Sequence, residues 1–250
     1  MSFINKVVLV TGASSGIGEA VCLHFAKLSA RLCLVDKDAE NLKKTAEDCE
    51  KLSRAKVLTT VADLRIDEQV HKAVENTKNQ FGRIDVVINC AGIYKHASLF
   101  DANLIEIYDD IISSNLRSIV YMTNCVAEEL VKSKGNIINI SSVSGVFQCA
   151  LYKTAVAALN HFTASVASEL ASKGVRINSI APGVVKTRIL VNAGVDQEAS
   201  EALWNDASAA PLKKLVKTED VAELAAFLAS DKAKAMTGCS YPVDAGLAIA

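Results

Sequence analysis

The sequence predicts an α/β fold in which one doubly wound parallel sheet of about seven strands carries helices on both faces. First, short apolar runs alternate with amphipathic segments of helical period along the whole chain. Second, half of the residues are hydrophobic but only 5% are aromatic, which suits a large aliphatic core. Third, a glycine-rich turn joins the first apolar run to the first helical segment. No linker, repeat or shift in composition divides the chain, so we predict a single domain over residues 1–250.

The expected strands are the apolar runs at 7–10, 32–35, 57–61, 86–89, 136–140, 176–180 and 240–243. The expected helices lie directly after the glycine turn and near 39–52, 68–81, 101–132, 153–172 and 219–230. Thr218 is the expected N-cap of the last helix, because Glu219 and Asp220 follow it in the first turn. This regular alternation predicts parallel strands joined by helical crossovers.

The charge balance and the cysteines argue against several classes of function. The net charge is −1, from 27 basic and 28 acidic residues without a basic stripe, so we expect no binding to nucleic acid or to an anionic membrane. The seven cysteines are scattered without a CxxC pair or a Cys/His cluster, so we expect no metal site. No apolar run approaches about 18 residues, and the first strand begins close to the start of the chain. We therefore expect a cytoplasmic protein whose partners are small molecules or copies of itself.

The glycine-rich turn, TGASSGIG at 11–18, has the composition of a phosphate-binding loop. Gly12, Gly16 and Gly18 leave the main chain uncovered, and a helix that begins there points free N–H groups at an anion. Glycines at this spacing also occur in ordinary tight turns. Asp36, at the end of the next strand and about 20 residues further on, can accept both hydroxyls of a ribose. The turn and the carboxylate together predict a dinucleotide site.

Polar residues also follow three further predicted strands. Asp63 follows the third strand, the run NCAG at 89–92 the fourth, and Ser141 and Ser142 the fifth. In doubly wound sheets the ligand lies outside the carboxyl ends of the strands. Asp63 taken alone is equally well explained as a turn residue. The three strand ends together predict that the site continues along this edge of the sheet.

These motifs, in this order, resemble those of the short-chain dehydrogenase/reductase family from Lys6 to about Gly246. The matching motifs are TGASSGIG, Asp63, NCAG at 89–92, Asn115, ISS at 140–142, Tyr152, GVRINSIAPG at 174–183, Thr187, TG at 237–238 and VDAG at 243–246. The resemblance implies a Rossmann-type sheet, a nicotinamide cofactor, and a homodimer or homotetramer built on the long central helices.

The resemblance also implies which residues contact the cofactor. The pyrophosphate and its ribose would be held by Gly12, Ser14, Gly16, Ile17 and Gly18. The adenine would be contacted by Asp63 and Leu64, and the floor of the site would be formed by Asn89, Ala91 and Gly92. The nicotinamide carboxamide would be contacted by Pro182, Gly183, Val185 and Thr187, and Tyr152 would also contact the cofactor. Asp36 would repel the 2′-phosphate of NADP, so we predict NAD.

By the same resemblance, Tyr152 would be the general acid or base, Ser142 would bind the substrate oxygen, and Asn115 would complete a proton relay. The family's lysine, four residues after the tyrosine, is Val156 here. Lowering the pKa of a phenol from about 10 to 7 takes about 4 kcal/mol. A nearby ammonium supplies ~1–4 kcal/mol of this, and valine supplies none. Lys153 lies roughly 60° around the helix from position 156, so it either reaches the ring or is a solvated surface lysine.

The loop between Ser142 and Tyr152 also departs from the family, because ten positions separate the two residues where about thirteen are usual. Three residues would give about 10 Å of reach. The segment 145–151 must therefore be tighter, which puts the convergence of the two hydroxyls in question.

Two functions follow from these observations. The first is an NAD-dependent oxidoreductase that interconverts a secondary alcohol and a ketone by hydride transfer. The alternative, suggested by Val156 and the short loop, is an NAD-binding protein with little dehydrogenase turnover. The resemblance implies that residues 93–99, 147–151 and 186–204 border the substrate, and the pocket would be mainly apolar because of Ile93, Tyr94, Phe147, Leu190, Val191, Leu203 and Trp204. Each of these side chains is equally well explained as packing a lid or a subunit contact. A steroid, terpenoid, fatty or small cyclic carbonyl would suit such a pocket.

Overall fold

The computed structural model describes residues 1–143, 149–206 and 210–249, and its strands form one seven-stranded sheet. The strand order is β3-β2-β1-β4-β5-β6-β7, and every neighbouring pair is parallel. The strands are β1 (Val7–Thr11), β2 (Arg31–Asp36), β3 (Leu58–Val61), β4 (Val86–Asn89), β5 (Asn136–Ile140), β6 (Arg176–Pro182) and β7 (Ser240–Val243). The predicted doubly wound parallel sheet is confirmed, and each predicted apolar run contains a strand.

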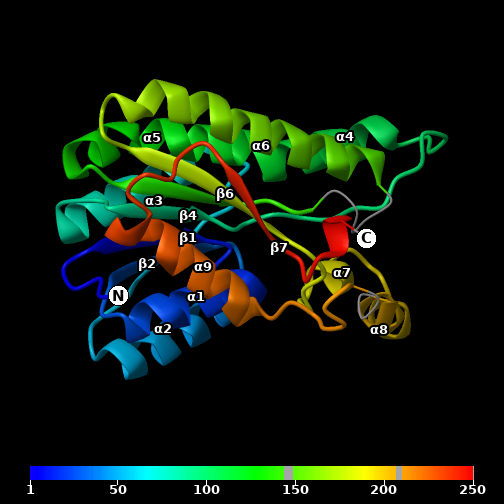
Figure 1. Cartoon of the computed structure of the whole chain (residues 1–250), viewed down its shortest axis with the longest axis horizontal. Coiled ribbons are helices and arrows are strands. Elements are labelled where there is room, and N and C mark those ends of the chain that lie inside the picture. Colours follow the sequence, from blue (N-terminus) through cyan, green and yellow to red (C-terminus); the bar gives the residue numbers. More distant parts are fainter. Residues whose placement is uncertain (144–148, 207–209, 250) are drawn as a thin grey trace.

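Helices cover both faces of the sheet, as Figure 1 shows. One face carries α1 (Gly16–Lys27), α2 (Ala39–Ser53) and α9 (Thr218–Ala229), and the other carries α3 (Asp67–Phe81), α5 (Ser118–Ser133) and α6 (Ala150–Ala171). In α1 the buried positions are 18, 21, 22, 25 and 26, the spacing of a helix with one apolar face. Each helical layer thus buries its own aliphatic cluster against the sheet. Within the described residues, no helix combines the length and apolarity that a bilayer span requires.

The long helix predicted at 101–132 is interrupted. It consists of α4 (Leu104–Ile112), a π-helical segment (Ser113–Arg117) and α5. Its first predicted turn is absent because the Asp101 carboxylate accepts a hydrogen bond from the Ser98 N–H (2.8 Å) and closes a separate turn there. Short π segments are frequent at functional sites. This one contains Asn115, the predicted relay residue.

Several predicted ends shift by a few residues, and single contacts explain two of these shifts. The N-cap of α9 is Lys217 and not Thr218, because the Asp220 carboxylate accepts the Lys217 N–H at 2.9 Å and fixes the helix start one residue earlier. Strand β6 continues to Pro182, because Ala181 and Pro182 still pair with β7. The extension carries β6 to the edge where the polar strand ends lie.

One buried carboxylate holds the opposite, amino-terminal edge of the sheet. Asp85, which is 2% exposed, accepts the N–H of Val7 (3.0 Å), Lys6 Nζ (3.2 Å) and two N–H groups of Arg83 (2.9 and 2.6 Å). Burial would raise the pKa of Asp85, but these hydrogen bonds outweigh burial and hold the pKa below its ordinary value. The ionised Asp85 therefore ties the start of β1 to the start of β4.

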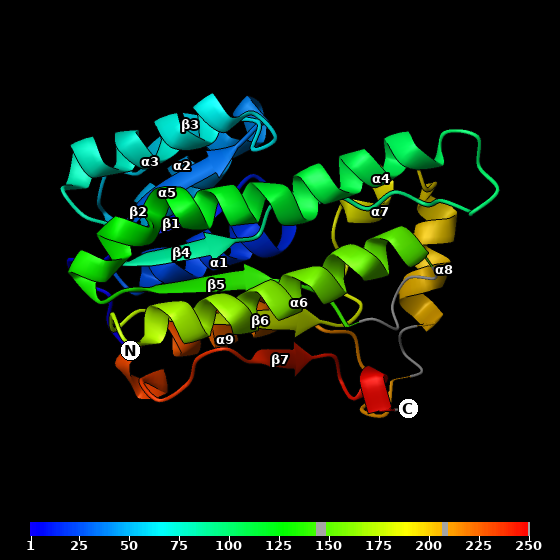
Figure 2. The same cartoon turned by 90° about the horizontal axis from the view of Figure 1, so that it is seen from above.

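The carboxyl ends of the strands form the functional edge. Figure 2 shows two further helices beyond this edge, α7 (Ile189–Asn192) and α8 (Gln197–Asp206). The strand order reverses between β1 and β4, because β2 and β3 lie on one side of β1 and the later strands on the other. Ligands of doubly wound sheets bind at this switch point. The fold therefore places the site between the loops that follow β1 and β4.

Candidate active site

The loop after β1 is a tight turn that leads into α1. Gly12 lies at φ +67°, a region that side chains rarely adopt, and a Cβ there would stand 2.7 Å from the Ala91 nitrogen. A Cβ on Gly18 would stand 2.0 Å from the Gly12 carbonyl oxygen. Ser15 is the N-cap of α1, but its side chain makes no capping hydrogen bond. The first amides of α1 are therefore available to an anion.

A cavity of about 600 Å³ lies over this turn. The predicted site residues that line it are Gly12, Ser14, Gly16, Ile17, Asp36, Asp63, Leu64, Ala91, Gly92, Asn115, Ser142, Tyr152, Pro182, Gly183, Val185 and Thr187. Gly18 and Asn89 do not line it. Asn89 is 2% exposed and donates from Nδ2 to Asn139 Oδ1 (2.9 Å), so its side chain joins β4 to β5 in the core. Among the described residues, no group of three or more His, Cys, Asp and Glu side chains could hold a metal ion.

Two main-chain amides orient the carboxylate at the end of β2. Asp36 Oδ2 accepts the Ser14 N–H (3.1 Å), and its Oδ1 accepts the Asp38 N–H (3.0 Å). These hydrogen bonds hold a half-buried negative charge beside the glycine turn. A carboxylate at this place can accept ribose hydroxyls and disfavours a 2′-phosphate.

Asp63 is held by an arginine that the sequence did not single out. Arg65 donates to both of its carboxylate oxygens, from Nη2 (2.6 Å) and Nε (3.0 Å), and these bonds lower the pKa of Asp63 to about 2. Arg65 Nη1 also lies 3.6 Å from Asp110 Oδ1, and Lys95 contacts the same carboxylate. An adenine amine would therefore share Asp63 with Arg65. This chain of ion pairs joins the rim at Asp63 to the loop after β4.

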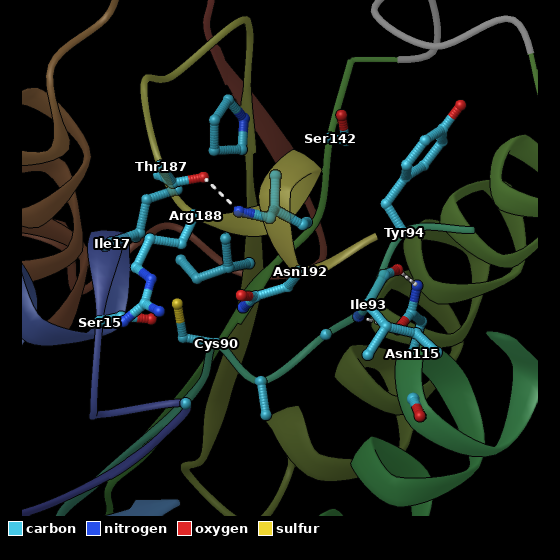
Figure 3. A pocket seen from close by; sticks show the side chains of 18 of the residues that line it. Ser15, Ile17, Cys90, Ile93, Tyr94, Asn115, Ser142, Thr187, Arg188 and Asn192 are labelled. Carbon is cyan, nitrogen blue, oxygen red and sulfur yellow. Dashed lines mark hydrogen bonds between the residues drawn. The ribbon is translucent and has the colours of Figure 1, made fainter. Parts of the chain in front are cut away.

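Asn115 fixes that loop from the π segment, as Figure 3 shows. Its Oδ1 accepts the Ile93 N–H, and its Nδ2 donates to the Ile93 carbonyl oxygen, both at 2.8 Å. The loop so held carries Ile93 and Tyr94 into the cavity. Asn115 thus positions the wall on which a substrate would rest.

Tyr152 and Ser142 meet in the cavity despite the shortened loop. Helix α6 begins at Ala150, earlier than predicted, which places Tyr152 in its first turn. Burial raises the pKa of Tyr152 above its ordinary value of 10.0 and outweighs the side-chain hydrogen bond with Ser142, which acts to lower it. The two hydroxyls therefore do converge. Residues 144–148 lie outside the described part of the chain, so the tightness predicted for 145–151 concerns mainly residues that are not described.

Val156 forms the cavity wall one helical turn after Tyr152. It is 7% exposed, and its neighbours Ala155 and Leu159 line the same wall. Lys153 does not line the cavity. After burial, the pKa of Tyr152 is shifted by its hydrogen bond with Ser142 and by the charge of Tyr94. Position 156 therefore contributes hydrocarbon to the cavity wall one helical turn after Tyr152.

The substrate end of the cavity is aromatic and aliphatic. The predicted pocket residues that line it are Ile93, Tyr94, Leu190 and Trp204. The rings of Tyr94 and Tyr152 meet edge to face, with centroids 5.6 Å apart and planes at 76°. Val191, 46% exposed, borders a neighbouring groove instead. Phe147 and the side chain of Leu203 lie outside the described residues.

Further polar groups line the cavity besides the predicted cofactor and catalytic residues. The buried Ser141 Oγ has no hydrogen-bond partner among the described residues. Arg188 and Asn192 reach the cavity from the chain around α7. Ser141 belongs to the polar strand end that the sequence already placed at this edge, whereas the only sequence signal for Arg188 is that it directly follows the motif residue Thr187.

Comparisons with known proteins agree with this geometry. A family model described as enoyl-(acyl carrier protein) reductase matches residues 12–248. The 3-oxoacyl-(acyl-carrier-protein) reductase FabG of Thermotoga maritima is 34% identical over 253 residues, which cover 100% of both chains. The crystal structure of levodione reductase matches with a TM-score of 0.91 at 32% identity and 99% coverage of each chain. That of 3-ketoacyl-(acyl-carrier-protein) reductase from Brucella melitensis, complexed with NADH, matches with a TM-score of 0.87 at 29% identity, covering 99% of this chain and 100% of that one.

A Rossmann-type sheet with a glycine turn and a serine–tyrosine pair at its switch point defines a nucleotide-dependent oxidoreductase fold. The chain belongs to the short-chain dehydrogenase/reductase family, whose members are oxidoreductases acting on alcohols and ketones.

Proposed function

We propose that the chain is an NAD(H)-dependent oxidoreductase that interconverts a secondary alcohol and a ketone on an apolar small molecule by hydride transfer. The observation that carries this proposal is that one cavity is lined by the glycine turn, Asp36, Ser142 and Tyr152. Relatives named as reductases of a 3-oxoacyl group and of levodione support a carbonyl substrate. The aliphatic and aromatic wall around Leu190 and Trp204 supports an apolar one.

The cavity suits a nicotinamide dinucleotide. Its volume of about 600 Å³ lies within the usual range of small-molecule sites, roughly 300–1,000 Å³. The uncapped amides of α1 suit a diphosphate, and the buried Ser141 hydroxyl, which lacks a partner among the described residues, suits a polar ligand group. Asp36 supports NAD over NADP, because its charge opposes a 2′-phosphate. The NADH in the Brucella relative supports the same choice.

In this proposal Ser142 binds the substrate oxygen and Tyr152 transfers the proton. NADH, when bound, supplies the hydride. The Ser142 hydroxyl donates a hydrogen bond to the carbonyl oxygen, where negative charge develops. The Tyr152 phenol, which is protonated at neutral pH because its pKa lies above 10.0, gives its proton to that oxygen. In the oxidative direction Tyr152 must first be ionised in order to accept the proton of the alcohol.

Val156 favours a second function, an NAD-binding protein with little dehydrogenase turnover. The glycine turn and Asp36 lie outside α6, so loss of the lysine leaves the dinucleotide end of the cavity intact. Burial raises the pKa of Tyr152 and so disfavours its phenolate, and a valine at position 156 does not offset this. General acid–base catalysis is worth about 10²–10⁴-fold in rate, and this is the contribution that Val156 weakens.

Fluorescence titration with NADH, followed by assays of a ketone and alcohol panel, separates the two functions. The oxidoreductase should bind NADH more tightly than NADPH and reduce at least one apolar ketone. If the natural sequence binds NADH but turns over nothing, and Val156→Lys restores turnover, the chain is a binding protein. If neither NADH nor NADPH binds at micromolar concentration, both proposals are wrong.

We further propose that the protein acts in the cytoplasm as a homodimer or homotetramer, without nucleic-acid or membrane partners. The net charge of −1 supports the absence of polyanionic partners. Exposed apolar side chains on and before α4 support self-association, namely Leu99 (73% exposed), Phe100 (96%) and Ile105 (67%). Sedimentation analysis should find two or four copies, and a monomer would contradict this proposal.

A further inference from the structure

The segment after β6 places Arg188 close to the glycine turn. Thr187 packs directly on this turn, because a Cβ on Gly16 would lie 3.1 Å from Thr187 Cγ2. The next residue, Arg188, lines the cofactor cavity and also the groove of about 560 Å³ that adjoins Ser15 and Gly16. In Figure 3 the Arg188 side chain extends toward the labelled Ser15, and both residues line the cavity and the adjoining groove. The positive charge of Arg188 therefore lies in the same cavity as the uncapped start of α1.

The cations that line this cavity among the described residues are Lys37, Arg65 and Arg188. Arg65 is bound to Asp63 at 2.6 Å, and of the other two only Arg188 also borders the groove beside Ser15 and Gly16. The side chain of Arg188 is exposed and forms no hydrogen bond or ion pair with a described residue. The carboxylate that its charge influences is Asp38, at a longer distance. Hydrogen bonds from Asn41 lower the pKa of Asp38, and the charge of Arg188 lowers it further.

We propose that Arg188 binds the diphosphate of the cofactor and holds it against the first amides of α1. This inference rests on the proposed function, and it adds a residue that the family motifs do not assign. The glycine turn supplies N–H donors, but the start of a helix carries only about half an elementary charge, whereas a diphosphate carries two. A guanidinium adds a full charge and a planar pair of donors that match phosphate oxygens.

Isothermal titration of the full-length protein with NADH, ADP-ribose and adenosine tests this role. The first two ligands carry the diphosphate and adenosine does not. Arg188→Ala should weaken NADH and ADP-ribose about tenfold and leave adenosine unchanged, and Arg188→Lys should recover part of the loss. Lys186→Ala is the matched control: Lys186 is exposed, its Nζ lies 4.9 Å from the Trp204 ring, and it borders the adjoining groove but not the cofactor cavity. This control should bind all three ligands like the natural protein.

Salt provides a second readout. The affinity for NADH should fall with rising ionic strength in the natural protein, and the fall should be shallower in Arg188→Ala because one screened attraction is gone. An unchanged NADH affinity in Arg188→Ala, or an equal loss for adenosine, overturns the proposal. If the natural protein itself fails to bind NADH, the proposed function is wrong and this inference falls with it.

Discussion

Val156 should determine how alcohol oxidation depends on pH. Burial raises the pKa of Tyr152 above the ordinary value of a phenol, so at pH 7 only a small fraction of the phenol is ionised. Oxidation needs the phenolate, and its rate should therefore rise about tenfold per pH unit between pH 7 and 10. Ketone reduction uses the protonated phenol and should stay level over the same range. An ammonium that contributes ~1–4 kcal/mol would lower the pKa of Tyr152 by about 1–3 units.

The substitution Val156→Lys places that ammonium on the cavity wall. We expect the inflection of the oxidation profile to move down by about 1–3 pH units and the oxidation rate at pH 7 to rise about 10- to 1,000-fold. NADH absorbance at saturating NAD measures both. Val156→Met controls for side-chain length without charge, and Thr154→Lys adds the charge at an exposed position of the same helix. An oxidation rate that is already level near pH 7 in the natural protein, or equal gains from Val156→Met and Val156→Lys, would refute the reasoning.

Three further changes test the cofactor site and the fold. Asp36→Ala should improve NADPH binding relative to NADH by about tenfold or more, since it removes the opposing charge; an unchanged ratio of the two Kd values speaks against that role. Asp85→Asn should lower the free energy of unfolding in urea by about 2 kcal/mol. Because the folded-state pKa of Asp85 is depressed, this difference should be full above pH 4 and should shrink as the pH falls through the folded-state pKa. Gly12→Ala should abolish NADH binding, because its Cβ meets Ala91 at 2.7 Å, whereas Gly82→Ala, at φ +73° with nothing within 4 Å, should bind normally.

The sheet could be predicted from the sequence because the signals for strands are local. Each strand is a short apolar run between amphipathic helical segments, and parallel order follows from the crossovers. The ends of helices were harder to predict. The starts of α4 and α9 depend on Asp101 and Asp220, each of which accepts a single hydrogen bond from a main-chain N–H group. Periodicity carries no information about such bonds.

Most residues that the sequence predicted for the dinucleotide half line the cavity, although Gly18 and Asn89 do not, whereas the meeting of Ser142 and Tyr152 could not be predicted. The glycine turn and Asp36 depend on main-chain conformation at adjacent positions, which the motif specifies. Whether Ser142 meets Tyr152 depends on where α6 begins, and the loop length alone suggested the opposite of what is found. The hydrogen bonds from Arg65 to Asp63 and from Asn89 to Asn139 are tertiary contacts between single side chains. No pattern in the sequence indicates such contacts.

Deuterium transfer from NADH labelled at C4 to a ketone tests the proposed oxidoreductase most directly. Mass spectrometry of the product should find deuterium on the carbinol carbon with the natural protein. Tyr152→Phe should still bind NADH and should form labelled alcohol at least about 100-fold more slowly. Tight binding of NADH with no labelled alcohol from any ketone of the panel would contradict the proposed activity.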